Sequence, residues 1–489
     1  FGRAGAGIAA FGFALCGILV FYSGALLYVE LTVFLSLLAV WLVLVADRRW
    51  WRWTLAGAAF GLLVICRPEM LLLLPAFGVI LWRQGRGLRN VMLLVIAALL
   101  VIATVPARNL IVARDPVLFT GHSGINFYYG NNPASDGTWQ PAPELEATPG
   151  FSHARLEQVA RRINGEQVPW SRASAHWLNK GVRYLVSHPG RALELAGRKF
   201  LLFWADYEVP SNYYPETARA GSLPLRLAFI SFGIIAALAI PGLVLGWRDR
   251  KRNWPAYLFV AVHLVSALAF YVMSRLRAPV IPFLLLFAGL ALATLFRDLR
   301  ARRFGRPTWV LTVAALVFAG SLLVPVRKQE YSSQAWTQQG NILLSLRRAN
   351  EAKAAFERAV AANPANPSAR YSLLMVLAGM GRAGEAEQQY RELVRCCAAD
   401  PRAEPIVRLA GARVAVARRD FGAALAGYRR AIELDPGNPE SWYLLGLVYV
   451  STDSLPQAAA ALERALELDP GHSSAADILG RVRQRLGRP

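Results

Sequence analysis

The chain changes character near Val326, and this change limits the folds open to it more than any other feature. Before Val326 lie about nine apolar segments separated by arginine clusters; after it, a polar stretch repeats its own pattern. Two copies of the pattern have the same spacing, and their corresponding residues are Trp336/Trp442, Gly340/Gly446, Ala352/Ala458, Phe356/Leu462, Ala359/Ala465 and Pro364/Pro470. A third copy lacks the tryptophan and contains Ala412, Ala424, Tyr428, Ala431 and Pro436. Small residues at fixed positions let two helices pack closely, so a period of about 34 residues predicts a helical repeat array.

This spacing is that of the tetratricopeptide repeat, in which a proline follows each helix pair. Trp336 and Trp442 lie four residues further apart than three periods require, which places an insertion in the second copy, at 395–404. We therefore predict a repeat domain over 333–489, with no strands, made of helix pairs at roughly 333–366, 367–404, 405–438 and 439–472 and a capping helix from about Ser473 to Leu486.

The first 326 residues have the pattern of a membrane domain. The whole chain is 55% hydrophobic with a mean hydropathy of +0.33. Runs long enough, or nearly so, to cross about 30 Å of hydrocarbon lie at 88–106, 225–245, 278–296 and 308–324. We predict an all-α chain, in which a polytopic transmembrane helical bundle over 1–326 precedes the tetratricopeptide-repeat α-solenoid.

The net charge of +22 does not indicate a nucleic-acid partner. Much of the excess lies in short arginine-rich loops between apolar segments, as the positive-inside rule predicts, and no nucleic-acid-binding motif accompanies it. We therefore expect these basic residues to contact membrane lipid and not nucleic acid.

Four basic clusters set the expected orientation of the bundle. They are Arg48, Arg49 and Arg52; Arg83, Arg86 and Arg89; Arg248, Arg250, Lys251 and Arg252; and Arg297, Arg300, Arg302, Arg303 and Arg306. An even number of crossings separates each cluster from the next, so all four are placed in the cytoplasm. The crossings are expected at 54–65, 68–82, 88–107, 225–245, 254–273, 278–296 and 308–324. We therefore predict an integral protein of a bacterial inner (plasma) membrane, with a large loop over 108–222 and the repeats on the extracytoplasmic side.

The large loop carries helical patterns of its own, around 154–163, 171–186 and 190–204. The third has the aromatic and basic composition of a helix that lies at a membrane surface. This helix either only docks onto the bundle or guides a substrate, and the sequence leaves both alternatives open.

Charged residues near the outer ends of apolar segments are candidates for a binding site. Four arginines are expected there, against the positive-inside bias, in the pairs Arg67/Glu69 and Arg108/Asn109 and in the turn with Arg275 and Arg277. A planar guanidinium suits the phosphate of a lipid carrier, although each arginine alone could extend to lipid headgroups. Glu30, flanked by apolar runs, either faces an internal cavity or lies at the outer interface.

The segment 121–137 is dense in glycine, amides and tyrosine. Asn126, Tyr129, Asn131 and Asp136 are the side chains suited to sugar hydroxyls and sugar rings. The same composition also makes ordinary turns.

Four stretches together resemble a known family: FYSGALLYVELTVFLSLLAVWL at 21–42, AGAAFGLLVICRPEMLLLLP at 56–75, VPARNLIVARDPVLFTGHSGINFYYGNNPASDGTW at 105–139 and RLRAPVIPFLLLFAGLAL at 275–292. Their order and spacing are similar to those of the family 39 glycosyltransferases of the GT-C superfamily, which resemble protein O-mannosyltransferases and the bacterial lipid A aminoarabinose transferase. The resemblance covers about residues 1–326. It implies an enzyme that moves a sugar from a polyprenyl or dolichyl phosphate to an acceptor, protein or lipid, on the outer face.

The resemblance also implies roles for particular residues. Arg108 and Asn109, the segment 121–137, and Arg275 and Arg277 match the family pattern and would line the donor site. The catalytic acidic residue of the family follows its first transmembrane helix, and we expect this chain to begin after that point, so no catalytic residue is assigned. Some members use a divalent metal, and no ligand cluster in this sequence decides the matter. The implied mechanism is a single displacement, in which a carboxylate acts as base and arginines stabilise the departing phosphate.

Two other functions remain open at this stage. One is a non-catalytic envelope scaffold whose repeats recruit a protein or peptide partner. The other is a polyprenyl-linked oligosaccharide ligase or polymerase, which is also multi-spanning with a large outer loop.

Overall fold

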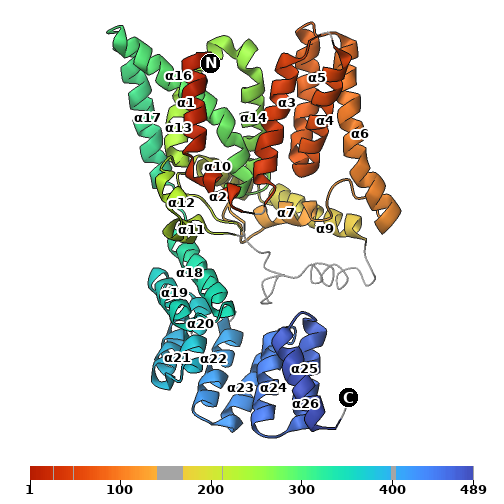
Figure 1. Cartoon of the computed structure of the whole chain (residues 1–489), viewed down its shortest axis with the longest axis vertical. Helices are drawn as coiled ribbons and strands as arrows, with labels where there is room; N and C mark the ends of the chain where they lie inside the picture. The colour runs from red at the N-terminus through yellow and green to blue at the C-terminus, as the bar shows by residue number, and fades with distance from the viewer. Residues whose placement is uncertain (26, 48, 140–168, 212, 398–402, 488–489) are drawn as a thin grey trace. The chain divides into compact units, whose positions relative to one another are not determined.

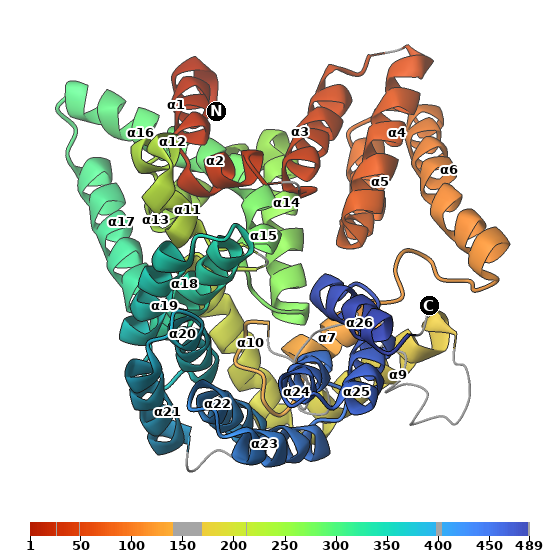
Figure 2. The same ribbon diagram turned by 60° about the horizontal axis from the view of Figure 1, so that its bottom comes forward.

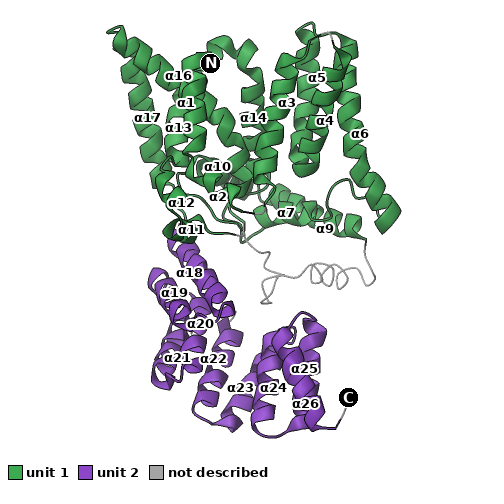
Figure 3. Cartoon of the chain, in the orientation of Figure 1, with its two compact units in different colours: residues 1–142, 157–326 green, residues 143–156, 327–489 purple. Residues whose placement is uncertain are grey.

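The computed structural model describes residues 1–25, 27–47, 49–139, 169–211, 213–397 and 403–487. The chain divides into two compact units, one over 1–142 and 157–326 and the other over 143–156 and 327–489 (Figure 3). Within the described residues the regular secondary structure of both units is helical, and the one strand-like pairing there is an isolated bridge between Cys16 and Ile230. The predicted all-α fold is therefore confirmed for this part of the chain.

Long apolar helices make up most of the first unit: α1 (Gly2–Ala14), α3 (Val29–Val45), α4 (Trp50–Cys66), α5 (Leu73–Arg83), α6 (Leu88–Ala113), α13 (Phe232–Gly246), α14 (Arg250–Ala269), α16 (Ile281–Arg300) and α17 (Gly305–Leu323). Among the described residues, four stretches are long and apolar enough to cross a membrane, namely Leu88–Ala113, Phe232–Ala269, Ser274–Arg300 and Gly305–Leu323. Large apolar side chains such as Trp41, Leu100 and Leu316 are exposed on their surfaces. Such a surface suits lipid better than water.

The four basic clusters lie at the same end of these helices. Their described members lie in or next to the connections α3–α4, α5–α6, α13–α14 and α16–α17, which Figure 1 shows together at the upper end of the first unit. The segments α7 (Ser123–Gly130), α9 (Trp170–Ser187) and α10 (Pro189–Trp204) lie at the opposite end (Figure 1). The helix path in this unit therefore has the even number of passes between clusters that the charge pattern requires.

Close helix packing at glycine holds α4 against α6. A Cβ atom on Gly57 would overlap the carbonyl of Leu94, and one on Gly61 would come within 2.6 Å of the Val101 side chain. Beside this contact the rings of Phe60, Phe77 and Trp254 stack edge to face, with centroids 4.7 and 4.4 Å apart. Small residues thus bring the backbones together where aromatic residues fill the remaining space.

Short helices complete the first unit: α2 (Gly17–Ser23), η1 (Pro68–Leu72), α11 (Pro215–Gly221), α12 (Leu223–Leu227), η2 (Trp247–Asp249), α15 (Ser274–Arg277) and η3 (Ala278–Val280). Two predicted boundaries are wrong. The helix expected from Leu225 begins at Phe232, because the Ser231 hydroxyl accepts a hydrogen bond from the Ile234 amide and caps α13 there. The helix expected to end at Ala107 continues through Pro106 to Ala113 and ends where Arg114 adopts a left-handed conformation.

The second unit has the predicted repeat architecture. Its helix pairs are α18 (Lys328–Ser345) with α19 (Ala349–Ala362), α20 (Pro367–Gly379) with α21 (Ala383–Cys397), α22 (Glu404–Ala417) with α23 (Phe421–Leu434), and α24 (Pro439–Ser451) with α25 (Leu455–Leu468), followed by α26 (Ser473–Arg485). The four pairs and the capping helix are confirmed, and the first pair begins five residues earlier than predicted. Residues 398–402 of the expected insertion, and the helix expected at 154–163, lie outside the described residues.

Recurring residues of the repeat have recurring structural roles. A Cβ atom on Gly340 would overlap the ring of Phe356, and one on Gly446 would lie 2.8 Å from Leu462, so each glycine lets its two helices meet. Asn366 and Asn438 cap α20 and α24, because each side-chain oxygen accepts an amide hydrogen bond of 3.0 Å. One buried apolar cluster contains Leu377 and residues of α21 and α22. The second and third pairs therefore pack as parts of one array.

Candidate functional site

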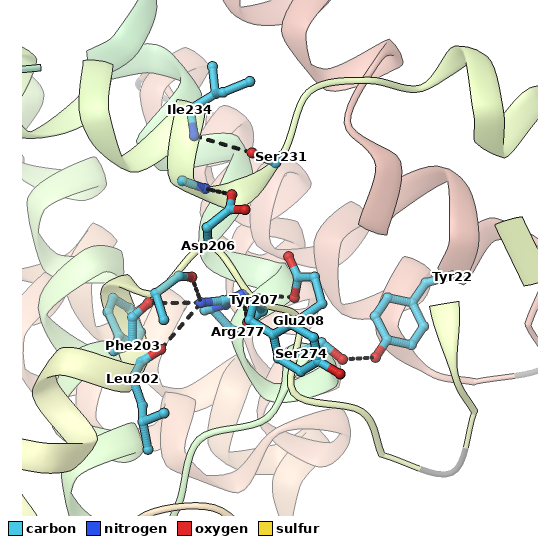
Figure 4. A network of polar contacts seen from close by, with 12 residues as sticks. Tyr22, Leu202, Phe203, Asp206, Tyr207, Glu208, Ser231, Ile234, Ser274 and Arg277 are labelled. Carbon is cyan, nitrogen blue, oxygen red and sulfur yellow. Dashed lines mark hydrogen bonds and ion pairs between the residues drawn. The ribbon is translucent and has the colours of Figure 1, made fainter. Parts of the chain in front are cut away.

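A buried arginine organises the end of the first unit that lies opposite the basic clusters. The Arg277 side chain is 3% exposed and stands over the Phe232 ring, 3.7 Å from its centroid. Its Nη1 donates to the carbonyls of Leu202, Phe203 and Ala205 at 3.4, 3.2 and 2.6 Å. Its Nη2 donates to the carbonyl of Tyr207 at 3.2 Å and forms an ion pair with Glu208 at 2.8 Å (Figure 4). Arg277 was expected to bind phosphate, but oxygen atoms of the protein already accept hydrogen bonds from, or pair with, both of its terminal nitrogens.

Polar residues around Arg277 fix the neighbouring backbone. The Asp206 carboxylate accepts a 2.8 Å hydrogen bond from the Gly233 amide at the start of α13. The hydroxyls of Tyr22 and Ser274 lie 2.7 Å apart (Figure 4), and the Ser274 amide donates to the carbonyl of Val209. Hydrogen bonds between residues far apart in the sequence thus attach the segment after α10 to α13 and α15, and attach α15 to α2.

Arg67 and Arg277 share one small cavity. The Arg67 guanidinium is buried, pairs with Glu69 through a 2.6 Å hydrogen bond from Nε, and points both terminal nitrogens at the Leu276 carbonyl at 3.4 Å. The cavity between the two arginines measures about 10 Å³, which is room for about one water molecule. It is too small for a phosphate group in this structure.

Arg275 differs from these two arginines because it keeps an unused donor. Its Nε is buried and has no hydrogen-bond partner among the described residues, while its guanidinium lies 5.8 Å from the centre of the Tyr28 ring. Burial raises the pKa of Tyr271 to about 12, and Arg275 and Arg67 both act to lower it, so Tyr271 lies within the electrostatic reach of both arginines. Nearby in sequence, Glu30 opens α3 half-buried, and its Oε1 finds no partner in the described part of the chain.

Arg108 and Asn109 stand apart from this cluster. They lie in the last turns of α6 and do not open a loop, contrary to the expectation. Arg108 is exposed and its guanidinium donates to Asn109 at 3.4 Å, and the Asn109 amide donates to the Val117 carbonyl at 2.9 Å. The structure brings Arg67, Arg275 and Arg277 together and gives Arg108 no contact with them.

The glycine- and asparagine-rich segment is a packed helix followed by a turn. A Cβ atom on Gly124 would overlap the Ser174 carbonyl of α9, and one on Gly130 would overlap the Phe270 carbonyl. The glycines therefore allow close contact between backbones. Composition alone could not distinguish this role from that of a sugar-binding loop.

Most of the amides and carboxylates proposed for sugar binding are occupied by the protein itself. Asn131 is buried, donates to the carbonyls of Phe127 and Ala269, and accepts from Lys199 Nζ at 2.8 Å. Asp136 accepts hydrogen bonds from the amide and hydroxyl of Thr138 at 2.9 and 2.6 Å. Tyr129 is buried with its ring 5.4 Å from that of Trp139, and Asn126 accepts a 3.4 Å hydrogen bond from Tyr271. These contacts favour a structural role for the segment.

Lys199, Asp206 and Glu208 were not among the site residues predicted from the sequence. Lys199 belongs to the helix expected at the membrane surface, where a lysine would be solvated, but its side chain is 1% exposed and bonds to Asn131 and the Leu268 carbonyl. Burial lowers the pKa of Lys199 to about 8. Burial also raises the pKa of Glu208, against the opposing effect of Arg277. The sequence did contain a signal for Asp206 and Glu208. These two carboxylates directly follow the aromatic end of a helix, in the sequence Trp204-Ala205-Asp206-Tyr207-Glu208.

No metal site can be assigned from the residues that the structure describes. Among them there is no group of three or more His, Cys, Asp or Glu side chains able to hold an ion. We therefore derive no step through the divalent metal that some members of the resembled family use.

The helices on the inner side of the curve of the second unit contribute a cluster of polar residues. Figure 2 shows α20, α22 and α24 on that side and α21 and α23 outside them. Tyr371, Arg413 and Tyr443 come from these three helices, and Arg413 and Glu440 both act on the pKa of Tyr371, which burial raises. The Tyr371 hydroxyl is buried and has no hydrogen-bond partner among the described residues. At one end of this cluster the ring of Tyr443 lies 4.7 Å from that of His472.

Comparison with known proteins agrees with the repeat assignment. Residues 337–401 and 409–473 match the tetratricopeptide-repeat family, so the repeats inferred from the spacing are confirmed. No curated protein sequence matches the chain. Among solved structures, MamA from Desulfovibrio magneticus RS-1 (residues 41 to the end) is 18% identical, with 32% of this chain and 86% of that chain covered and a TM-score of 0.24.

Two further solved structures are similar over about the same fraction of the chain. A thermophilic tetratricopeptide-repeat protein from Thermus thermophilus is 23% identical, with 32% and 84% of the two chains covered and a TM-score of 0.28. YrrB, described as a tetratricopeptide-repeat protein with an unusual peptide-binding site, is 20% identical, with 33% and 80% covered and a TM-score of 0.22. The chain thus combines tetratricopeptide repeats with a unit of long apolar helices.

Proposed function

We propose that the chain is a membrane-anchored scaffold whose repeats bind a segment of another protein along their inner side. The observation that carries the proposal is the Tyr371 hydroxyl, which is buried without a partner in the described structure. It lies within the electrostatic reach of Arg413 and Glu440, which also act on the pKa of Tyr443. A buried hydroxyl gains free energy when it acquires a hydrogen-bond partner, and the inner surface of a helical repeat array is where extended peptides bind. Aromatic rings and both signs of charge suit a polypeptide of mixed composition.

A peptide-library selection against the whole chain in lipid nanodiscs tests this proposal. We expect the selected peptides to bind Arg413→Glu and Tyr443→Ala chains at least tenfold more weakly than the parent, because both residues belong to the inner helices α22 and α24. The matched control is Arg430→Glu, which changes an exposed arginine on the outer helix α23. Equal loss in all three variants, or no loss in the first two, would contradict inner-side binding.

The anchoring part of the proposal rests on the charge arrangement. All four basic clusters lie at one end of the first unit, and α17 runs from that end to the opposite one before the repeats begin (Figure 1). With the clusters in the cytoplasm, the repeats are outside it. A reporter that is active only in the cytoplasm, fused after Pro489, is expected to give no signal, whereas a strong signal would reverse the topology.

A second candidate function is transfer of a sugar from a polyprenyl phosphate. Arg275 favours it, since this residue keeps a buried Nε without a partner in the described part of the chain and lies close to Arg67 and Tyr271 at the proposed outer end. We assign any donor phosphate contact to Arg275 and not to Arg277 or Arg108, because Arg277 is engaged by protein acceptors and Arg108 lies apart.

Binding of farnesyl phosphate by the chain in nanodiscs tests the second candidate, with farnesol as the uncharged control. The loss of one charge-assisted contact in Arg275→Gln is expected to weaken binding by about 1.5–3 kcal/mol, whereas Arg108→Gln leaves it unchanged. If farnesol binds as tightly as farnesyl phosphate, or if Arg275→Gln binds like the parent, the phosphate site is wrong.

A further inference from the structure

A second, larger cavity lies beside the Arg277 network. It measures about 110 Å³ and is formed by α2, α11, α12 and the residues that lead into α13. Its apolar lining includes Ile18, Phe21, Leu225 and Phe229, and its polar lining includes Glu208 and Arg219. Neither the scaffold nor the sugar-transfer proposal uses this space.

The Glu208 carboxylate gives the cavity a defined polar side. Both of its oxygens are buried. Oε2 forms the 2.8 Å ion pair with Arg277, and Oε1 accepts no hydrogen bond from the described residues. This ion pair compensates the charge, so the carboxylate does not require a cation. It still has lone pairs without donors, and a buried acceptor in that state is costly unless a donor arrives.

The surroundings of the cavity are apolar. Leu223, Leu227 and Phe229, on and just after α12, are exposed. An exposed apolar group beside a cavity indicates a hydrophobic neighbour such as a lipid chain. A ligand that suits both features has hydroxyl groups at one end and an alkyl chain at the other.

We infer that this cavity binds the hydroxylated headgroup of an amphiphile, with a hydroxyl of the headgroup donating to the Glu208 carboxylate and the alkyl chain lying along α12. Arg277 acts here as a positioning residue, because its ion pair holds the carboxylate in place. The inference is independent of what the repeats bind.

The test uses the whole chain in phosphatidylcholine nanodiscs and hexyl β-D-glucoside as the probe. Hydrogen–deuterium exchange of the backbone amides at 223–231 is measured as the glucoside is titrated. We expect saturable protection, at least tenfold weaker affinity in Glu208→Gln, and no saturable protection by hexyltrimethylammonium, which has the same chain and no hydroxyl group.

A pair of tryptophan variants separates the cavity from the folding of the unit. Leu225→Trp enlarges a lining residue while leaving the Glu208–Arg277 pair intact, and it should also weaken glucoside binding at least tenfold. Leu193→Trp changes an exposed residue of α10 that does not line the cavity, and it should bind as the parent does. Unchanged binding in Glu208→Gln and Leu225→Trp, tighter binding of the ammonium probe, or no saturable protection in the parent would overturn the inference.

Discussion

The two units of this protein differ in the groups that they expose and in the charges that they bury. In the repeats, alanine, leucine and tyrosine fill the interior, and charges pair on the surface three residues apart, as in Arg348–Glu351 and Arg464–Glu467. In the first unit the long helices expose large apolar side chains, whereas Arg67, Arg277 and Lys199 are buried. The same residue types therefore contribute differently to stability in the two units.

The difference has an energetic reason. An exposed ion pair is screened by water and adds little to stability. Removing one partner of a buried pair leaves the other charged or polar groups without compensation, which is strongly destabilising. The comparison therefore predicts large effects for polar substitutions in the first unit and small ones on the surface of the second, whose stability depends on close packing.

The largest effect is expected at Arg277. Arg277→Gln leaves Glu208 and several carbonyls without their donor, and breaking a buried ion pair costs about 3–5 kcal/mol. Thermal unfolding of the whole chain in nanodiscs measures the loss. Arg348→Gln is the matched control from the repeats, and its transition should coincide with that of the parent. Equal shifts in the two variants would remove the distinction between the units.

The next effect is a pH dependence at Lys199. Burial lowers the pKa of Lys199 from 10.5 to about 8, so between these values the unfolded chain binds more protons and stability rises with pH. From pH 7 to 9.5 the first unit should gain about 2 kcal/mol from this residue. Lys199→Met lacks the titrating amine, and the difference between the parent and this variant isolates the effect from other groups. A parent and variant with parallel pH profiles would mean that Lys199 titrates normally.

The smallest effect concerns packing in the repeats. Gly340→Ala places a methyl group against the Phe356 ring, and overpacking of this kind costs about 1 kcal/mol or more. Gly480→Ala in α26 is the control, because nothing lies within 4 Å of the added carbon and alanine favours a helix. Chemical unfolding followed by circular dichroism should show a loss for the first and a gain for the second. A gain in both would mean that the pair α18–α19 has free space.

The contrast between the units also explains what the sequence could predict. The helix pairs of the repeats follow from a spacing of glycine, alanine and proline, since each residue contacts others less than one period away, as Gly340 contacts Phe356. The apolar segments of the first unit were recognisable by length and composition for the same local reason. Helix ends were less accessible, because Pro106 lies inside α6 and Ser231 caps α13.

The polar clusters of the first unit depend on contacts between distant parts of the chain. Arg277 meets the carbonyls of residues 202–207, and Arg67 meets the carbonyl of Leu276, 209 residues away. The sequence could place these arginines near one end of the bundle, but it could not show that protein acceptors would engage them. The glycines at 124 and 130 likewise have a composition that fits both a binding loop and a helix contact.

Site-specific photo-crosslinking of the intact chain in its own membrane tests the scaffold most directly. A photoreactive residue at Leu447, on the inner helix α24, is compared with one at Gln457, on α25. The account predicts one discrete protein adduct from position 447, absent from position 457 and reduced at least tenfold when Arg413→Glu is added. The same adducts from both positions, or an adduct from 447 that Arg413→Glu leaves unchanged, would contradict it.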